Sequence, residues 1–283
     1  KFRNYQDKNI KVEKKYKKML ENQNIKYVEN MKNIYFKNIK KKYNIWYLIN
    51  KMDDIIDESD PDSELPQIFH AYQTAESIKK RYFYNNKIKN NINIKYLFSN
   101  DEWNNLPEKY KNNFNNTITN FYKNIIDWEW LQLIGFIHDL GKIMLLDEFG
   151  SLPQWSVVGD TFPVGTSLSS NFVFYDKKYY LGNNDLNTDI YKNYIGFNNV
   201  IFSWSHDEYL AHLLEENKTN LSKEAIYIIR YHSFYSWHTP RNGDRGYTKL
   251  ANDFDWYMLP LLKLFQKSDL YSKNNNICNI SNI

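Results

Sequence analysis

Residues 131–142 read LQLIGFIHDLGK, a run in which a helical apolar pattern leads into three chemically active side chains. Leu131, Ile134 and His138 recur at the spacing of one helix face, which predicts a helix over about 127–141. A helix that ends beside a cavity would present its last side chains to that cavity. The segment therefore predicts both a helical fold and the position of a functional site.

Asp139 and Lys142 give the end of this helix its chemistry. Successive helical residues point ~100° apart, so His138 and Asp139 reach one centre only where the helix meets a cavity. The two oxygens of Asp139 allow it to bridge two metal ions. Lys142 lies on the same side of the helix, where a cation can bind a substrate oxygen or shuttle a proton. Taken alone, a His-Asp pair arises often by chance, and this lysine is typical of a solvated helix end.

Further candidate ligands lie on both sides of this segment. For any single histidine, a hydrogen-bonded core residue is the commoner interpretation, but the complete set is hard to explain by packing and indicates a two-metal centre. Imidazole ligands favour Fe, Zn, Cu or Ni. Asp207 and Glu208 are more typical of residues that support metal ligands by hydrogen bonds, or of surface residues. His212 and His238 are more typical of ordinary structural histidines. The candidate ligands are His70, His138, Asp139, His206, His232 and Asp269.

The rest of the chain is predicted to be mostly helical, an all-α bundle around the metal site with minor short strands. Residues 157–176 are expected to be irregular, with a short extended piece. We expect one domain over residues 1–283, and residues 83–126, which are rich in Asn and Lys, form a predicted surface insertion within it. The further predicted helices cover 45–56, 68–81, 222–232 with Ser222 as N-cap, and a last helix from about Pro260 that bears Asp269.

Composition limits the classes of function. The 37 basic and 33 acidic residues give a net charge of +4, which is too balanced to indicate a nucleic-acid-binding protein. No apolar run approaches the ~18 residues of a membrane span. Cys278 is the single cysteine, so a disulfide within the chain is excluded and a reducing compartment, the cytoplasm, is expected.

Several longer motifs together resemble the myo-inositol oxygenase family. They extend over most of the chain outside the N-terminal helix and the Asn-rich stretch, and they are more specific than a His-Asp pair. Ser205 and Ser268 stand where this family is expected to have Gly and Phe. The motifs are Phe2-Arg3-Asn4-Tyr5, 57–62 (DESDPD), 69–76 (FHAYQTAE), 138–142 (HDLGK), 153–165 (PQWSVVGDTFPVG), 203–209 (SWSHDEY), 232–239 (HSFYSWHT) and Asp269-Leu270-Tyr271.

The resemblance implies an HD-domain fold around two iron ions, Fe(II) and Fe(III), with O2 as co-substrate. His70, His138 and Asp269 would hold one ion, His206 and His232 the other, and Asp139 would bridge them. The implied oxidoreductase cleaves the C1–C6 bond of myo-inositol to give D-glucuronate, and acts as a monomer. Lys142 would be catalytic. The implied substrate-binding residues are Arg3, Asp57, Ser59, Lys142, Gly159, Asp160, His232 and Ser233.

Two other functions stay open at this stage. An HD-domain phosphohydrolase uses a similar His-Asp centre to activate water, but it would need more basic residues than Lys142 and Arg3 to bind phosphate. A non-catalytic, metal-stabilised module would be expected to have lost ligands or Lys142, whereas this sequence retains them. The chemical product distinguishes the three: glucuronate, phosphate or neither.

Overall fold

The computed structural model describes residues 10–36, 42–60, 65–83, 94–120, 128–240 and 245–272. Within these ranges the chain is an all-α fold, as predicted, in which helices are joined by short 3₁₀ turns, and extended structure is limited to one antiparallel bridge between Pro163 and Phe202. The helices are α1 (Ile10–Asn22), α2 (Ile25–Phe36), α3 (Ile45–Lys51), α4 (Gln67–Ile78), α5 (Asn100–Asn104), α6 (Glu108–Asn120), α7 (Trp128–Ile137), α8 (Gln154–Val157), α9 (His206–Glu216), α10 (Lys223–Tyr231), α11 (Tyr235–His238) and α12 (Asp253–Ser272).

Side-chain caps begin several of these helices. The predicted cap at Ser222 is confirmed, since its hydroxyl accepts from the Ala225 N–H at the start of α10. Asn44 caps α3 in the same way. Ser99 and Glu102 form a reciprocal capping box at α5. Each cap satisfies an N–H group that the first turn of a helix leaves without an intrahelical partner.

The helix that bears Asp269 begins at Asp253, so the predicted start near Pro260 is wrong. Pro260 lies inside α12, although proline removes one helical hydrogen bond and crowds the preceding turn. The neighbouring Leu259 and Leu261 are both almost completely buried. Apolar burial on either side of the proline therefore outweighs its local preference to begin a helix.

Two other predicted elements have different bounds. The helix expected over 127–141 ends at Ile137 and continues as a 3₁₀ segment, Leu140–Leu145. The extended piece expected within 157–176 is reduced to Pro163. The alternating Phe172 and Phe174 lie in turns instead, and Phe174 has the left-handed φ of 58°, which breaks the geometry of a strand.

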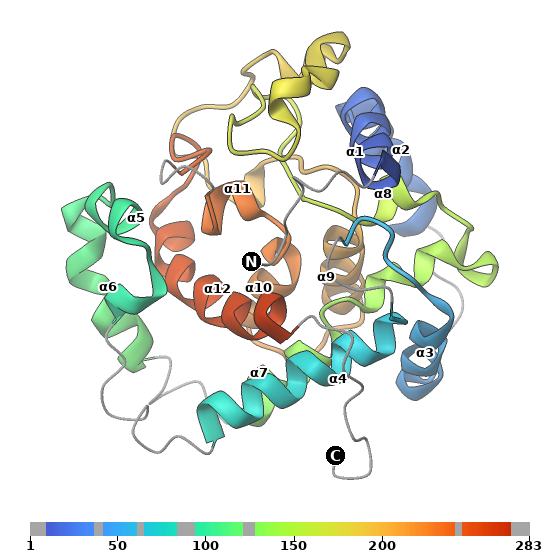
Figure 1. Ribbon diagram of the computed structural model, residues 1–283, viewed down its shortest axis with the longest axis horizontal. Coiled ribbons are helices and arrows are strands. Elements are labelled where there is room, and N and C mark those ends of the chain that lie inside the picture. The colour runs from blue at the N-terminus through green and yellow to red at the C-terminus, as the bar shows by residue number, and fades with distance from the viewer. Residues whose placement is uncertain are drawn as a thin grey trace.

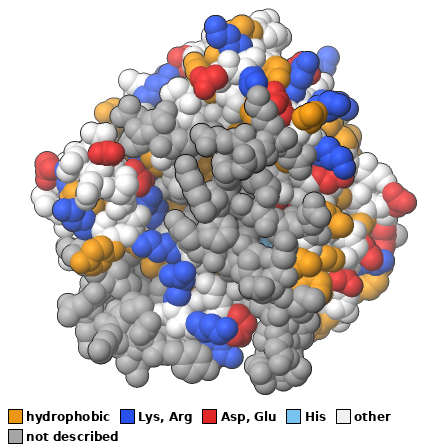
Figure 2. All heavy atoms as spheres, in the orientation of Figure 1, with side chains coloured by type: hydrophobic (Ala, Val, Ile, Leu, Met, Phe, Trp, Pro, Cys, Tyr) orange, Lys and Arg blue, Asp and Glu red, His pale blue; other side chains and the backbone are white. Residues whose placement is uncertain are grey.

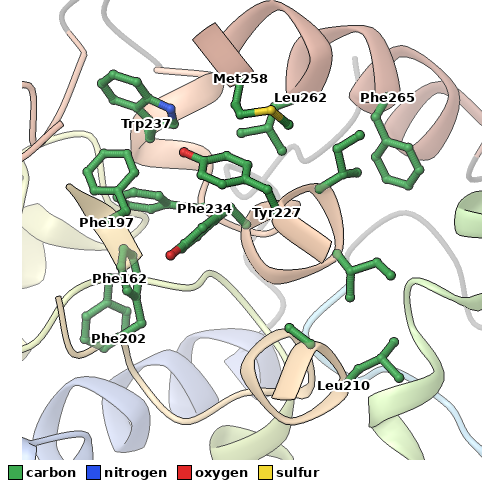
Figure 3. Packing of buried hydrophobic residues seen from close by; sticks show 14 of the residues in the cluster. Phe162, Phe197, Phe202, Leu210, Tyr227, Phe234, Trp237, Met258, Leu262 and Phe265 are labelled. Carbon is green, nitrogen blue, oxygen red and sulfur yellow. The ribbon is translucent and has the colours of Figure 1, made fainter. Parts of the chain in front are cut away.

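The central helices pack around α12 and α10. In Figure 1, α4 and α7 run side by side, and α12 crosses close to them. α10 packs against both α9 and α12. Figure 3 shows the aromatic part of this core, where Phe197 lies between Phe234 and Trp237 with ring centroids 5.2 and 5.0 Å away. The helices that carry the candidate ligands are thus fixed by one continuous core.

Residues 94–120 are more deeply packed than their Asn- and Lys-rich composition indicates. Ile94, Leu106 and Phe114 are buried, and α6 packs against α12. Glu102 is also buried and bonds to Lys263 of α12 at 2.6 Å. The limits of the insertion stay a prediction, but several apolar side chains in its described part belong to the core.

The described surface carries both signs of charge. On the face shown in Figure 2, basic and acidic side chains lie interspersed around the rim. Within the described ranges, each helix is too short or too polar to cross a membrane.

Candidate metal centre

Asp139 occupies the turn between α7 and the 3₁₀ segment that follows it. The His138 N–H still bonds to the carbonyl of Ile134 at 2.8 Å, whereas Asp139 has φ −93° and ψ 0°. This sparsely populated region of backbone conformation is one in which many active-site residues lie. The change of helix type turns the carboxylate into the interior, where it is 2% exposed.

The two oxygens of Asp139 face two different groups of side chains. Oδ2 lies 3.5 Å from Nε2 of His138 and 3.7 Å from Nε2 of His70. Oδ1 lies 3.1 Å from Nε2 of His206 and 3.5 Å from Nε2 of His232. A carboxylate between two sets of imidazoles has the arrangement required of a ligand that bridges two metal ions.

The first set, here the His70 group, comprises His70, His138 and Asp269. His70 comes from the first turn of α4, His138 follows α7, and Asp269 lies near the end of α12. Oδ1 of Asp269 is 2.9 Å from Nε2 of His70 and 3.6 Å from Nε2 of His138. All three are buried, and two imidazoles and a carboxylate therefore converge from three separate helices.

The second set, here the His206 group, comprises His206 and His232. His206 is the first residue of α9 and His232 directly follows α10. Their Nε2 atoms are 3.3 Å apart. Ser205, in place of the expected glycine, is the N-cap of α9 and accepts from the Glu208 N–H. Both imidazoles are buried and approach Oδ1 of Asp139, whereas the His70 group approaches Oδ2.

Backbone carbonyls fix the tautomer of three imidazoles. Nδ1 of His138 lies 2.9 Å from the oxygen of Gly135, Nδ1 of His206 2.7 Å from that of Val157, and Nδ1 of His232 2.8 Å from that of Ile229. A carbonyl only accepts, so each Nδ1 is the donor. In the neutral ring Nε2 then carries a lone pair directed at the centre, as metal-ligating histidines require.

The electrostatics of the metal-free centre show a shortage of positive charge. Burial by itself raises the pKa of Asp139, but Lys142 and the imidazoles hold it well below its ordinary value. Burial lowers the pKa of His206, but the carboxylates of Asp207 and Asp139 raise it to about 10. The pKa of His232 is also raised against burial, chiefly by Asp207. Protons on these rings thus supply the charge that cations could supply.

The residues present fit a pair of metal ions. Nε2 of His138 is buried and has no hydrogen-bond partner among the described residues. Two triads of donor atoms each lie within 4.8 Å of one another: His70, His138 and Asp139, and Asp139, His206 and His232. Imidazole and carboxylate donors together suit Fe and other borderline transition metals rather than Mg or Ca.

Lys142 lies beside Oδ2 of Asp139, the oxygen that faces the His70 group. It is 3% exposed, so the alternative of a solvated helix end is excluded. Its Nζ donates at 2.8 Å to Oδ2 of Asp139, Oδ2 of Asp57 and Oε1 of Gln67. The Lys142 side chain thus lies between two carboxylates at the edge of the centre.

The predicted substrate-binding residues that the structure describes lie around one small cavity at the metal centre. The Asp57 carboxylate accepts from the Ser59 N–H and hydroxyl at 2.8 and 2.6 Å. Gly159 has φ +101°, a conformation that glycine adopts without strain. Arg3 falls outside the described residues. The lining includes Asp57, Ser59, Lys142, Gly159, Asp160, His232 and Ser233.

Several residues of the site were not singled out in the sequence. Gln67 lies one turn before His70 on α4, and that spacing could have indicated a shared face. Tyr16 of α1 donates to Oδ1 of Asp160 at 2.7 Å. Tyr16, Asp60 and Tyr235 also line the cavity. Nothing in the sequence pattern joins these segments.

Asp207 is closer to the centre than its assignment as a supporting or surface group suggests. It is completely buried, and its Oδ1 lies 2.7 Å from Nε2 of His206 and 3.7 Å from Nε2 of His232. Its other oxygen accepts from the Thr161 hydroxyl at 3.0 Å. The neighbouring Glu208 pairs with Lys32 and Arg230 away from the ligands.

Gly141 sets how closely the two groups approach. A Cβ atom at this position would lie 2.2 Å from the backbone oxygen of His206. The 3₁₀ segment and the first turn of α9 are therefore in direct backbone contact, and only a residue without a side chain fits between them.

The comparisons with known proteins agree with this geometry. A family model described as myo-inositol oxygenase matches residues 9–94 and 101–283. The chain is 35% identical to an inositol oxygenase of Dictyostelium discoideum, over 100% of this chain and 83% of the relative. It is 37% identical to an inositol oxygenase of Mus musculus, over 96% of this chain and 81% of the relative.

A plant relative gives the same result. The chain is 37% identical to a probable inositol oxygenase of Oryza sativa subsp. japonica, over 100% of this chain and 79% of the relative. The family match is interrupted only between residues 95 and 100, so it includes the helices that carry all the candidate ligands. The chain therefore belongs to the myo-inositol oxygenase family.

Proposed function

We propose that this chain cleaves the C1–C6 bond of myo-inositol with O2 and forms D-glucuronate at a centre of two iron ions in an HD-type helical domain. Membership of the family supports the inositol oxygenase activity. One observation supports the two-ion centre: Oδ2 of Asp139 faces the His70 group, and Oδ1 faces the His206 group.

The ligand sets follow from these two groups. His70, His138 and Asp269 would hold one ion, His206 and His232 the other, and Asp139 would bridge them. With Asp139, the His206 group supplies two histidines and one carboxylate, the donor set of many non-haem iron oxygenases. When bound, the Fe(II)/Fe(III) pair supplies Lewis acidity toward substrate hydroxyls and electron transfer to O2.

The overall reaction balances without an external reductant. Myo-inositol and O2 together contain the atoms of glucuronic acid and one water molecule. The C1–C6 bond breaks, one of its carbons becomes a carboxylate and the other an aldehyde, while O2 takes up four electrons. The protein has to bind the ring, orient that bond and control the protons that its hydroxyls release.

The cavity suits a polyol. A cyclic hexol presents six hydroxyls and little apolar surface, so a selective site must pair nearly all of them. Arg3 is proposed as one further partner. The proposed partners are carboxylates, hydroxyls and a backbone segment, and those described line the cavity: Asp57, Ser59, Gly159, Asp160 and Ser233.

Lys142 is proposed as the catalytic cation. Nζ donates to three acceptors, which accounts for the three protons of an ammonium group. A substrate oxygen would therefore replace one of them, and Gln67 is the only neutral acceptor of the three. Lys142 could then contact the substrate while both of its carboxylate pairs stay in place.

The phosphohydrolase alternative receives less support. Among the described residues that line the cavity, Lys142 is the only lysine or arginine, and it already bonds to two carboxylates. A phosphate group would meet more negative than positive charge there. The proposal also includes a monomer that acts on a small polyol, and a cytoplasmic location, which the single Cys278 supports.

The test is O2 uptake by iron-reconstituted protein supplied with myo-inositol, with glucuronate assayed in the same sample. We expect one glucuronate formed for each O2 consumed. Phosphate release from nucleotides without O2 uptake would support the phosphohydrolase. Neither product, in protein that has bound two iron ions per chain, would contradict the proposed reaction.

A further inference from the structure

The backbone carbonyl of His232 is held by two buried side chains that the proposed reaction does not use. The ring of His238 lies with Nε2 2.8 Å from this oxygen, and the amide nitrogen of Gln266 donates to the same oxygen. The carbonyl lies at the end of α10, where helices lack intrahelical donors for their last carbonyls. The contacts therefore fix the backbone of a candidate metal ligand.

The hydrogen bonds of His238 define its tautomer. A carbonyl accepts only, so Nε2 is the donor to His232, and Nδ1 lies 2.9 Å from the Thr239 hydroxyl, from which it can accept. The ring is completely buried. The ring therefore donates to the His232 carbonyl through Nε2, with Nδ1 left to accept from Thr239.

The short helix that carries His238 is anchored on both sides. Its neighbour Trp237 packs against Phe197 at 5.0 Å and Trp256 at 4.9 Å between ring centroids, as Figure 3 shows for the first pair. On the other side, Nζ of Lys263 donates to the backbone oxygen of His238 at 2.9 Å. These contacts hold the backbone that carries the His238 ring in place independently of its hydrogen bond to His232.

We propose that His238 and Gln266 are positioning residues that orient His232 and thereby set the affinity of the His206 group for its iron ion. The inference rests on the proposed two-iron centre. His232 is then fixed twice, at Nδ1 by the Ile229 carbonyl and at its own carbonyl by the two side chains. Removal of the second restraint would let Nε2 move relative to Oδ1 of Asp139, from which it lies 3.5 Å away.

The test is an Fe(II) titration of metal-free protein, under anaerobic conditions, with affinity and stoichiometry measured at each site. His238→Leu removes the donor and keeps the bulk, while His238→Gln places an amide N–H where Nε2 stood. Gln266→Met removes the second donor. His212→Leu is the matched control, because His212 stacks on Phe36 at 3.5 Å and is not among the residues of the centre.

We expect wild-type protein to bind two ions. His238→Leu should weaken Fe(II) binding at one site by about tenfold or more and leave the other site unchanged. Loss of a hydrogen-bond partner of a metal ligand usually lowers metal affinity on this scale. His238→Gln should restore the weakened site, and Gln266→Met should weaken the same one. The ratio of the two affinities is the decisive quantity, because general loosening of the fold would lower both together.

Three results would overturn the inference. The first is wild-type affinity at both sites in His238→Leu, or in Gln266→Met if the first variant does not fold. The second is an equal loss at both sites, or a similar loss in His212→Leu, which would indicate a general structural role. The third is fewer than two sites in the wild type, which would remove the proposed centre as well, whereas the first two leave that centre intact.

Discussion

The two sides of Asp139 differ in the number of donors that they present. The His70 group offers two imidazoles and the Asp269 carboxylate, from three helices, whereas the His206 group offers two imidazoles. Asp207 approaches the second group but also accepts from Thr161. An ion on the side with fewer protein donors would keep more coordination positions for substrate, so we expect substrate to bind at the His206 group.

The largest effect should come from removal of one ligand on either side. We expect His206→Ala to retain the ion of the His70 group and to hold fewer than two irons per chain, because the second ion loses one of its two imidazoles. Turnover should fall by roughly three orders of magnitude or more, about 4 kcal/mol of activation free energy. Metal analysis and O2 uptake on the same preparation measure both.

The matching change on the other side is His70→Ala. Myo-inositol should still bind to this variant if substrate contacts the ion of the His206 group, and should not bind to His206→Ala. Equal substrate affinity in the two variants would remove the distinction between the sides. Two irons and normal turnover in His206→Ala would contradict the ligand assignment itself.

A smaller effect is expected from Lys142→Met, which keeps the length of the side chain and removes the charge. Turnover should fall by roughly 10²- to 10⁴-fold, the usual contribution of a positioned proton-transfer group, with both irons retained. Lys109→Met serves as the control, because Lys109 also bonds to a carboxylate, that of Asp253, but at the exposed surface. Loss of iron from Lys142→Met would show that the lysine supports the ligands rather than the substrate.

The smallest predicted effect is a dependence of metal affinity on pH. The raised pKa of His206, about 10 in the metal-free protein, means that an entering ion displaces a proton from this ring. Affinity at the His206 group should therefore fall by about tenfold for each pH unit between 9 and 7. Calorimetry of Fe(II) binding in buffers of different ionisation enthalpy counts the released protons.

The same pKa has a consequence for stability without metal. The ordinary value for histidine is 6.5, so the contribution of His206 to the free energy of unfolding is fully present below pH 6.5 and is lost as pH rises toward about 10. Asp139 and Asp207 have lowered pKa values, and their contributions stay constant over that range. Urea unfolding of metal-free protein at pH 6.5 and 9.5 should show the loss, and identical midpoints would contradict it.

The helices were predictable where apolar spacing and caps act locally. The helix that bears His70 and the Ser222 cap of α10 follow from short-range pattern. The start of α12 did not, because the burial of Leu259 and Leu261 keeps Pro260 within the helix. Likewise, the Asn- and Lys-rich composition of residues 94–120 gave no sign that this segment has a buried side. Phe114 of this segment packs into the core.

The site shows the same division between local and long-range information. Residue type and order indicated the candidate ligands, but which oxygen of Asp139 faces which group depends on how α7 changes to a 3₁₀ turn. The approach of Asp207 to His232 and the contact of Gln67 with Lys142 arise from tertiary packing. A single sequence contains no pattern for such contacts.

At Gly141, close backbone packing limits how near the two proposed ions can lie to each other. A methyl group there would meet the His206 carbonyl at 2.2 Å, so even alanine would move α9 away from the turn that bears Asp139. Small increases in side-chain volume at this one position would thus act as a spacer between the halves of the centre. An engineer who wished to tune the coupling between two metals, and with it their redox behaviour, would begin at a residue that binds neither of them.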